Sequence, residues 1–323
     1  ENAPGVIATL EVDLPGETAP ATVMVVHEAV EHQTDLWVRV LDDLSLRIDD
    51  AVLFADVAGV ADADPCSPLA PLVGRRTAEL HHALAGAGSD TPLDASMRPE
   101  PFNLQWQRSI VQAVRNSVRA TQRELKRHLR SGRLGDRADG LARTLVDRGD
   151  ELITRFDRLA TDRLRASRIR IHGDLHLGQI LWTGHDIVFI DFEGEPGQPI
   201  GQRRIKRSPL GDVAGLLRSF DYAGRVAIDT MIERGRVTGN DLDALETWRR
   251  RWTELSQQEL LTAYRDEMAD TDLIPEDDDD LTLLLDVYVI TKSLYEVRYE
   301  LANRPAWVAW PMSSLVELLD RRP

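Results

Sequence analysis

Apolar residues are frequent near the N-terminus in two short stretches, 6–13 and 21–27. Such stretches are typical of β-strands, and residues 14–17 (LPGE) between them favour a turn. Apolar residues are denser in the second stretch. We therefore expect a β-hairpin whose second strand is the more buried one.

Beyond this hairpin, apolar residues recur at intervals of three and four, as they do along one face of an amphipathic helix. A first helix is expected over about 34–53. The stretch 54–74 is rich in Pro, Gly and Ala and favours a loop or a weak helix. Surface loops are expected at 87–100 and 194–208. The remainder predicts a mostly helical body, with helices near 77–84, 103–132, 139–168, 209–235, 240–268, 281–303 and 312–320.

An acidic run at 276–280 precedes one of these helices. Acidic side chains at a helix start interact favourably with the backbone dipole. A calcium-binding loop is the alternative, but the run lacks the spaced ligands and the central glycine of such a loop. We therefore interpret the run as a helix start.

The composition is that of a globular protein without a basic excess. Of 323 residues, 42% are apolar and 29% charged, and the formal net charge is −15. That acidity argues against a nucleic-acid partner, because phosphates require cations. Cys66 is the only cysteine, which excludes an intrachain disulfide and a cysteine-rich zinc site. No apolar run approaches the ~20 residues of a membrane span and no signal peptide is visible. We therefore expect a cytoplasmic protein without a membrane partner.

The residues with the clearest chemistry follow the centre of the chain. The sequence HGDLHLGQ at 172–179 places an aspartate and a glutamine five residues apart, and the apolar stretch 187–190 after it ends in Asp191. Phosphoryl transfer needs one carboxylate to orient the attacking hydroxyl. It also needs an amide and a second carboxylate to hold Mg²⁺ against the phosphates. We therefore predict Asp174 as the catalytic base, and Gln179 and Asp191 as ligands of Mg²⁺.

Neighbouring side chains have predicted supporting roles. Glu193 is close enough in sequence to support a second metal ion. His172 is expected to fix the loop through backbone hydrogen bonds, and His176 to do the same or to face the substrate. The chemical alternative is a zinc site of His172, Asp174 and His176, since histidines four apart can ligate a metal. That alternative leaves Gln179 and the following strand unexplained.

The segment 172–196 resembles the aminoglycoside-phosphotransferase-like kinases and, within them, the bacterial maltokinases, which make maltose 1-phosphate from maltose and ATP. The resemblance continues through 202–210 (QRRIKRSPL) and 212–220, and it resumes at 292–300 and 303–307. The stretch QRRIKRSPL is particularly similar to the maltokinase domain found fused to trehalose synthase.

This resemblance implies an α+β, protein-kinase-like fold of two lobes. Residues 1–33 would be the truncated remnant of a small ATP-binding β-lobe, and 34–323 a mainly helical lobe with the catalytic loop and the sugar site. The hinge that meets adenine would be His27, Glu28, Ala29 and Val30.

The start of the sequence departs from the kinase pattern. No lysine precedes Lys126, and no glycine-rich loop precedes residue 27. The chain therefore resembles such a kinase without the first strands of its small lobe. We expect weak ATP binding if nothing precedes Glu1 in the working protein.

The resemblance also implies roles for residues nearer the C-terminus. Asp212 matches the aspartate that braces the catalytic loop, and Lys292, Tyr295 and Tyr299 match residues that line the sugar pocket. Glu296 shares their helix face, because positions three and four apart are neighbours on a helix. The alternative is a buried face whose polar groups pair with one another, Lys292 with Glu296 for example.

We therefore expect a kinase that uses ATP and Mg²⁺ to phosphorylate maltose at its anomeric hydroxyl, with trehalose synthase as a candidate partner. A glucosamine or aminoglycoside kinase is the alternative within the class, although the charge of Lys292 should repel a cationic amine. A non-catalytic, kinase-like sugar-binding module is the third interpretation, favoured by the missing phosphate-binding lysine.

Overall fold

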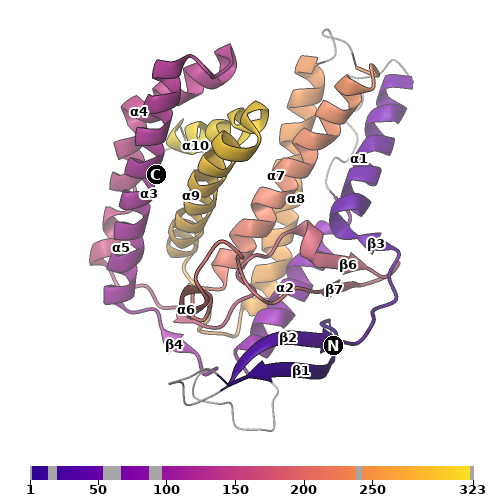
Figure 1. Ribbon diagram of the computed structural model, residues 1–323, viewed down its shortest axis with the longest axis vertical. Coiled ribbons are helices and arrows are strands. Elements are labelled where there is room, and N and C mark those ends of the chain that lie inside the picture. The colour runs from indigo at the N-terminus through magenta and orange to yellow at the C-terminus, as the bar shows by residue number, and fades with distance from the viewer. Residues whose placement is uncertain (1, 14–19, 54–66, 87–96, 238–241, 321–323) are drawn as a thin grey trace.

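The computed structural model of the chain describes residues 2–13, 20–53, 67–86, 97–237 and 242–320 (Figure 1). The turn expected at 14–17 lies outside these residues. So does most of the region 54–74 and most of the loop expected at 87–100. The structure does not test these three predictions.

The body of the molecule is helical, as the spacing of apolar residues predicts (Figure 1). The longer helices pack in pairs: α2 on α8, α3 on α4, and α7 on both α8 and α9. The helices are α1 (Leu36–Leu53), α2 (Ala70–Leu84), α3 (Leu104–Ser131), α4 (Asp136–Thr154), α5 (Asp157–Thr161), α6 (Ile200–Arg203), α7 (Leu210–Glu233), α8 (Leu242–Met268), α9 (Asp278–Asn303) and α10 (Ala309–Asp320). Two 3₁₀ turns, η2 (Leu177–Gln179) and η3 (Pro305–Trp307), complete the helical elements of the described residues.

Helix α7 forms the centre of the core. Its residues are buried on nearly every side, and it contacts α1, α8 and α9. Helix α9 packs on α7 and also on α3 and α10, so it joins the two halves of the helical body. It buries a stripe of apolar side chains spaced three or four apart, namely Leu284, Val287, Ile290, Leu294 and Val297.

Within the described ranges, three small antiparallel sheets accompany the helices. Strand β1 (Val6–Val12) pairs with β2 (Ala21–His27), and β4 (Glu100–Pro101) pairs with β5 (Ser167–Arg168). The third sheet has the order β3 (Thr34–Asp35), β6 (Ile180–Trp182) and β7 (Ile187–Phe189). The expected α+β class, with small β-elements and a large helical body, is confirmed at this level.

The second strand of the hairpin is only slightly less exposed than the first, and neither strand is buried. Both strands are exposed, and Val23 and Met24 of β2 are 57% and 52% exposed. Within the described ranges, the large apolar side chains of the two strands stay between 39% (Val26) and 64% (Ile7) exposed. The apolar density of β2 therefore does not correspond to burial within the described chain.

The helix expected over 139–168 is shorter than its apolar pattern suggests. Helix α4 ends at Thr154, and Phe156 leaves the helical conformation with φ −104° and ψ 13°. The Phe156 side chain is fully buried. Helix α5 then runs for five residues before the chain pairs with β4. Burial of Phe156 and the pairing of β5 thus override the helical propensity of this segment.

The acidic run at 276–280 starts a helix, as predicted. Asp277 is the N-cap of α9, and its side chain accepts a hydrogen bond of 3.0 Å from the backbone N–H of Asp280. No helix among the described residues has the length and apolarity that crossing a membrane requires.

Candidate active site

The β6–β7 hairpin brings the two predicted metal ligands together. Ile180 pairs with Phe189, and the backbone N–H of Ile190 donates to the carbonyl of Gln179 at 3.0 Å. Gln179 and Asp191 therefore lie side by side although twelve residues separate them. The Gln179 Nε2 donates to Asp191 Oδ2 at 2.9 Å.

Asp191 has a left-handed backbone, with φ +66°. An aspartate tolerates this region better than most residues, but the conformation is uncommon and recurs at functional sites. The chain then turns back, so that the Phe192 ring packs against His172 with ring centroids 5.0 Å apart. This return keeps the end of β7 against the loop that carries Asp174.

Buried hydrogen bonds hold the loop before Asp174. Asp212, in the first turn of α7, accepts from the backbone N–H groups of His172 at 2.8 Å and Gly173 at 2.9 Å. The His172 Nε2 lies 2.8 Å from the carbonyl oxygen of Ile190. Asp212 and His172 therefore lie where they can hold the backbone of the loop, as their predicted roles require.

A second layer supports Asp212 from helices α2 and α8. The Nε2 of His81 lies 3.2 Å from Asp212 Oδ2, and its Nδ1 lies 2.9 Å from the Tyr264 hydroxyl. All three side chains are buried. The sequence pattern did not reveal His81 or Tyr264, because only the packing of α2 on α8 and α7 brings them to Asp212.

A glycine lets α7 approach the catalytic loop. A Cβ added at Gly215 would lie 2.3 Å from the carbonyl oxygen of Leu175, a distance that side chains do not tolerate. Any larger residue would push α7 and the loop apart. Gly215 therefore fixes how close Asp212 comes to the backbone of residues 172 and 173.

The Asp212 carboxyl predicts a pH-dependent contribution to stability. Burial alone would raise its pKa, but hydrogen bonds from His81 and Gly173 and the charge of His81 hold it below the usual value. Because the folded-state pKa is lowered, the ionised form stabilises the fold above the unfolded-state pKa. This contribution is lost as the pH falls through the folded-state pKa.

Replacing Asp212 with Asn should therefore destabilise the protein near neutral pH, since an amide cannot accept both backbone hydrogen bonds in the same way. The stability difference from wild type should stay constant between about pH 5 and 7 and shrink below about pH 4. Urea unfolding across this range measures it, with Asp50→Asn, an exposed position on α1, as control. A difference that grows on acidification would contradict the assignment.

The predicted base lines a cavity of about 270 Å³ between the catalytic loop, the segment 194–207 and helix α9. Asp174 Oδ1 lies 3.3 Å from Lys292 Nζ, which also sits 5.4 Å from the centre of the Tyr295 ring. The polar residues of the cavity wall include Ser117, Asp174, Glu195, Gln198, Gln202, Arg203, Arg207, Lys292, Tyr295 and Arg298.

The structure does not bring every predicted sugar ligand into this cavity. Glu296 is turned away and accepts a hydrogen bond from Arg218 Nε at 2.9 Å; its burial raises the pKa of its carboxyl. Tyr299 stacks on Tyr295 with centroids 6.2 Å apart but does not line the cavity. The suggested pairing of Lys292 with Glu296 is also wrong, because the two side chains bind Asp174 and Arg218 instead.

His176 has a local role. Its Nδ1 accepts from the backbone N–H of Gly178 at 3.1 Å and so caps the 3₁₀ turn η2. Its burial lowers the pKa of the imidazole. His176 is not among the residues of the cavity wall. Within the described ranges no three histidine, cysteine or acidic side chains are arranged to hold a metal, so the zinc alternative has no structural support.

Gln179 and Asp191 suit a hard divalent cation, because carboxylate and amide oxygens are the ligands that Mg²⁺ accepts. Glu193 is directed elsewhere: its Oε2 lies 3.7 Å from Arg203 Nη1. The geometry therefore favours Gln179 and Asp191 over Glu193 as metal ligands.

Glu195 and Arg298 are among the cavity residues that the sequence did not predict. Glu195 has its Oε1 buried with no hydrogen-bond partner among the described residues. Burial and the negative charge of Glu195 raise the pKa of Tyr295 to about 12. Arg298 donates to Ser117 Oγ at 2.8 Å. A place for Arg298 beside Tyr295 could have been predicted, because residues three apart share a helix face. The place of Glu195 in the cavity could not, because it depends on how the loop folds.

The expected hinge lies apart from this cavity. His27 ends β2, and the backbone N–H of Glu28 donates to the carbonyl of Gly5 at 2.8 Å. Residues 27–29 are exposed, and none of the residues 27–30 lines the cavity. Their predicted contact with adenine stays a prediction.

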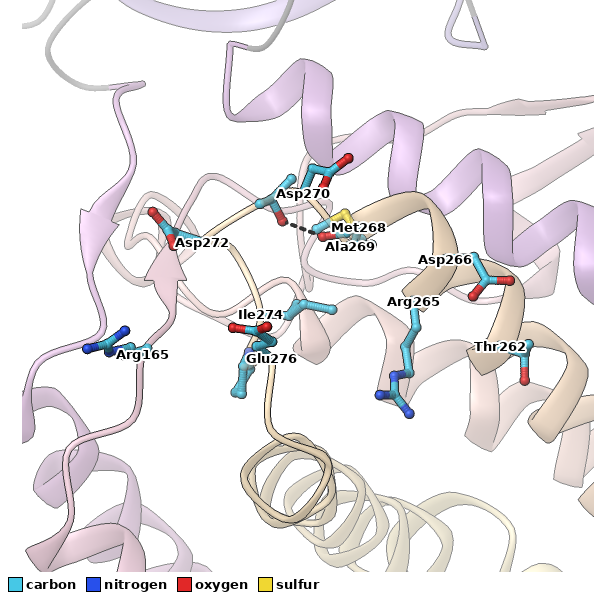
Figure 2. A pocket seen from close by; sticks show the side chains of 12 residues that line it. Arg165, Thr262, Arg265, Asp266, Met268, Ala269, Asp270, Asp272, Ile274 and Glu276 are labelled. Carbon is cyan, nitrogen blue, oxygen red and sulfur yellow. Dashed lines mark hydrogen bonds between the residues drawn. The ribbon is translucent and has the colours of Figure 1, made fainter.

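A larger depression of about 570 Å³ lies elsewhere, between the end of α8 and the start of α9. Figure 2 shows the acidic side chains of Asp266, Asp270, Asp272 and Glu276 around it, together with Arg165 and Arg265. It contains none of the predicted site residues. We call it the α8–α9 groove and use its residues as controls below.

Comparison with known proteins identifies sugar kinases as relatives. No protein-family model matches the chain. The glucosamine kinase of Streptacidiphilus jiangxiensis is 30% identical over 283 residues, which are 87% of this chain and 56% of that enzyme. The glucosamine kinase of Mycolicibacterium smegmatis is 29% identical over 160 residues, 46% of this chain and 34% of that enzyme. The chain thus spans little more than half the length of the first relative.

A solved structure of glucosamine kinase in complex with glucosamine, ADP and inorganic phosphate superimposes with a TM-score of 0.69 at 23% identity. The match covers 99% of this chain and 68% of that structure. The chain has the fold of the glucosamine kinases. A second crystal form of such an enzyme gives a TM-score of 0.68. The relatives are sugar kinases, as the sequence predicts, but they are not maltokinases.

Proposed function

We propose that this chain belongs to an ATP-dependent kinase that phosphorylates an amino sugar, with glucosamine as the acceptor. The observation that carries the proposal is a cavity that holds both Asp174 and a second carboxylate, Glu195, with a buried oxygen lacking a hydrogen-bond partner. One carboxylate serves the chemistry. The other interacts with the Tyr295 side chain, and its Oε1 is available for an ammonium group. The similarity to glucosamine kinases supports the same acceptor.

Asp174 would orient the acceptor. A sugar hydroxyl in the cavity donates a hydrogen bond to the Asp174 carboxylate, and its oxygen attacks the γ-phosphorus of ATP. The bond from that phosphorus to the β–γ bridging oxygen breaks, the proton passes to Asp174, and ADP and a sugar phosphate result. Lys292 holds the carboxylate in place at 3.3 Å.

Gln179 and Asp191 would hold Mg²⁺ at the end of the β6–β7 hairpin. Such an ion neutralises charge on the phosphates during transfer. Asp191 is directed there by its left-handed backbone, and Gln179 by its pairing with the end of β7. Asp212 fixes the position of Asp174, because it accepts hydrogen bonds from the two backbone N–H groups immediately before that residue.

The position of Glu195, rather than the summed charge of the wall, favours a cationic sugar over maltose, because the wall also carries Arg203, Arg207 and Arg298. Lys292 does not repel an ammonium group as a free cation would, because Asp174 compensates its charge. Glu195 adds a negative charge. It would attract an ammonium group at ~4 Å with an energy of roughly 1–4 kcal/mol, depending on the effective dielectric constant. Ligand pockets for larger molecules commonly run from ~300 Å³ upward. A cavity of about 270 Å³ therefore fits a monosaccharide better.

Maltose remains the second candidate because of one observation. The Tyr299 ring is stacked beside Tyr295 and is 43% exposed, so it extends an aromatic surface beyond the cavity. A second sugar ring would stack on such a surface. Trehalose synthase as a partner follows only from the sequence resemblance and belongs with this candidate.

A coupled assay of ADP release tests the proposal directly. The protein is supplied with ATP, Mg²⁺ and, in parallel, glucosamine, glucose, maltose or kanamycin. We expect the highest kcat/KM with glucosamine. A higher value with maltose or kanamycin would overturn the proposed acceptor, and sugar binding without any turnover would favour a non-catalytic module.

Replacing Glu195 with Gln should reduce selectivity for the amine. The amide keeps the shape of the side chain but removes its charge, so KM for glucosamine should rise about tenfold or more while KM for glucose changes little. Initial rates over a range of sugar concentrations measure both constants. Glu276→Gln, an exposed position in the α8–α9 groove, is the matched control. An equal effect on both sugars would remove Glu195 from amine recognition.

A further inference from the structure

The loop between β7 and α6 is folded around a single guanidinium group. Arg203, the last residue of α6, donates from Nε to the carbonyl of Gln198 at 2.8 Å and from Nη2 to the carbonyl of Pro196 at 2.8 Å. Its Nη1 lies 3.5 Å from the carbonyl oxygen of Glu193 and 3.7 Å from that residue's carboxylate. Three backbone positions and one carboxylate of the same short loop thus converge on Arg203.

This loop supplies part of the cavity wall. Gly194, Glu195 and Gln198 line the cavity from the loop, and Gln202 and Arg203 line it from α6. The loop starts at the predicted metal ligand Asp191, so it joins the phosphate side of the site to the sugar side. Its conformation decides where the Glu195 carboxylate lies.

The remaining bonds of the loop are few and local. The backbone N–H of Gln198 donates to the carbonyl of Glu195 at 3.0 Å, and that of Gln202 to the carbonyl of Pro199 at 2.8 Å. Gly194 has φ +75°, which turns the chain so that its Cα faces the aliphatic part of Arg203. Carbonyl oxygens that point inward like this repel one another unless a donor lies between them.

Arginine suits this position better than lysine. Its guanidinium is a rigid planar fork with five N–H donors, whereas an ammonium group is a compact charge on a flexible stem. The carbonyl groups of residues 193, 196 and 198 are contacted by three different nitrogens of the guanidinium, Nη1, Nη2 and Nε. A lysine at 203 keeps the charge but has a single nitrogen in place of these three.

We propose that Arg203 is a positioning residue that folds the loop 193–198 and thereby sets both sugar affinity and selectivity for the amine. The proposal rests on the proposed function for the identity of the sugar, but not for the conformation of the loop. Arg203 acts through Glu195 and Gln198, and it takes no part in the transfer of the phosphoryl group.

The test compares wild type with Arg203→Lys and Arg203→Gln, with Arg204→Lys as the matched control, because Arg204 is the exposed next residue. Circular dichroism and thermal melting first show that each variant folds. Hydrogen exchange of the peptide spanning 192–202, followed by mass spectrometry without any ligand, reads the loop directly. Both Arg203 variants should exchange at least about tenfold faster there, as loss of charge-assisted hydrogen bonds implies.

Steady-state kinetics then measure how the same variants change sugar binding and turnover. Arg203→Lys should raise KM for glucosamine about tenfold, lower kcat by less than about threefold, and leave KM for ATP unchanged. The ratio of kcat/KM for glucosamine to that for glucose should fall in the same variant. Arg204→Lys should match wild type in all of these measurements.

The outcomes separate the two proposals. Exchange in 192–202 that equals wild type, or a shift in KM no larger than that of Arg204→Lys, would overturn the role of Arg203 while the kinase function stands. A wild-type protein that rejects amino sugars would overturn the proposed function and with it the selectivity role. The exchange result would then still decide whether Arg203 folds the loop.

Discussion

Replacing Asp174 with Asn is expected to lower kcat for sugar phosphorylation by about 10²–10⁴-fold, the usual contribution of a general base. The amide is almost the same size, but it cannot accept the proton of the sugar hydroxyl. Lys292 loses its anionic partner at 3.3 Å, yet it is partly exposed and water can solvate it. The fold should therefore persist, and KM for ATP should change little. Initial-rate kinetics at saturating sugar and ATP measure the effect.

The control for this variant comes from the larger depression. Asp266→Asn changes an exposed aspartate in the α8–α9 groove (Figure 2) and should retain the wild-type rate within about twofold. If Asp174→Asn kept a near-normal rate, Asp174 would have no part in the chemistry. A large loss in Asp266→Asn would instead place the reaction in the α8–α9 groove.

The largest effect on stability is expected from Asp221→Asn. Asp221 is buried on α7 and lies 3.0–3.1 Å from the guanidinium nitrogens of Arg218, Arg225 and Arg249. Burial alone would raise the pKa of this carboxyl, but the three positive charges hold it well below its usual range. Removing the negative charge leaves three buried cations close together. Loss of one partner from a buried ion pair costs about 3–5 kcal/mol, and we expect a loss of at least this size.

Urea unfolding at neutral pH measures this loss, with Asp150→Asn as control. Asp150 is an exposed aspartate on α4, and its change should alter the free energy of unfolding by less than about 0.5 kcal/mol. Asp221→Asn should lower the urea midpoint without a change in slope. A midpoint within the range of the control would mean that water or a rearranged partner compensates the arginines.

The same network connects stability to the site. Arg218 binds Asp221 on its own helix and Glu296 on α9, and Glu296 lies one turn beyond Lys292. The polar face of α9 is therefore divided between two tasks. Lys292 and Tyr295 face the cavity, while Glu296 ties α9 to α7. This tie fixes the rotation of α9 and so the direction in which Lys292 reaches Asp174.

Local patterns were enough to place most helices and the catalytic motif. Apolar spacing located α7, α8 and α9 because their buried stripes have a helical period, and Asp277 marked the start of α9. The spacing of Gln179 and Asp191 predicted that they meet, because a tight hairpin brings these two residues together. The family resemblance added the bracing role of Asp212, which the hydrogen bonds to the backbone of His172 and Gly173 match.

The state of the charges in the cavity could not be predicted from local patterns, because it depends on partners distant in sequence. A helix face showed that Lys292 and Glu296 are neighbours, but not that each would bind a residue of another element. The helix face alone predicts a free positive charge on Lys292, whereas in the structure Asp174 compensates that charge. Glu195 was overlooked because its path into the cavity depends on a loop that Arg203 folds.

The sequence by itself determined the helical body, the hairpin at its start and the group of acids and amide that predicts phosphoryl transfer. These features follow from interactions between residues close along the chain, where periodicity and turn chemistry act. Only the tertiary structure decided which face of α9 meets the cavity, which charges remain available for a substrate, and that the apolar strand β2 is exposed. Charge compensation on α9 depends on partners 78 and 118 residues away along the chain, and no local pattern records them.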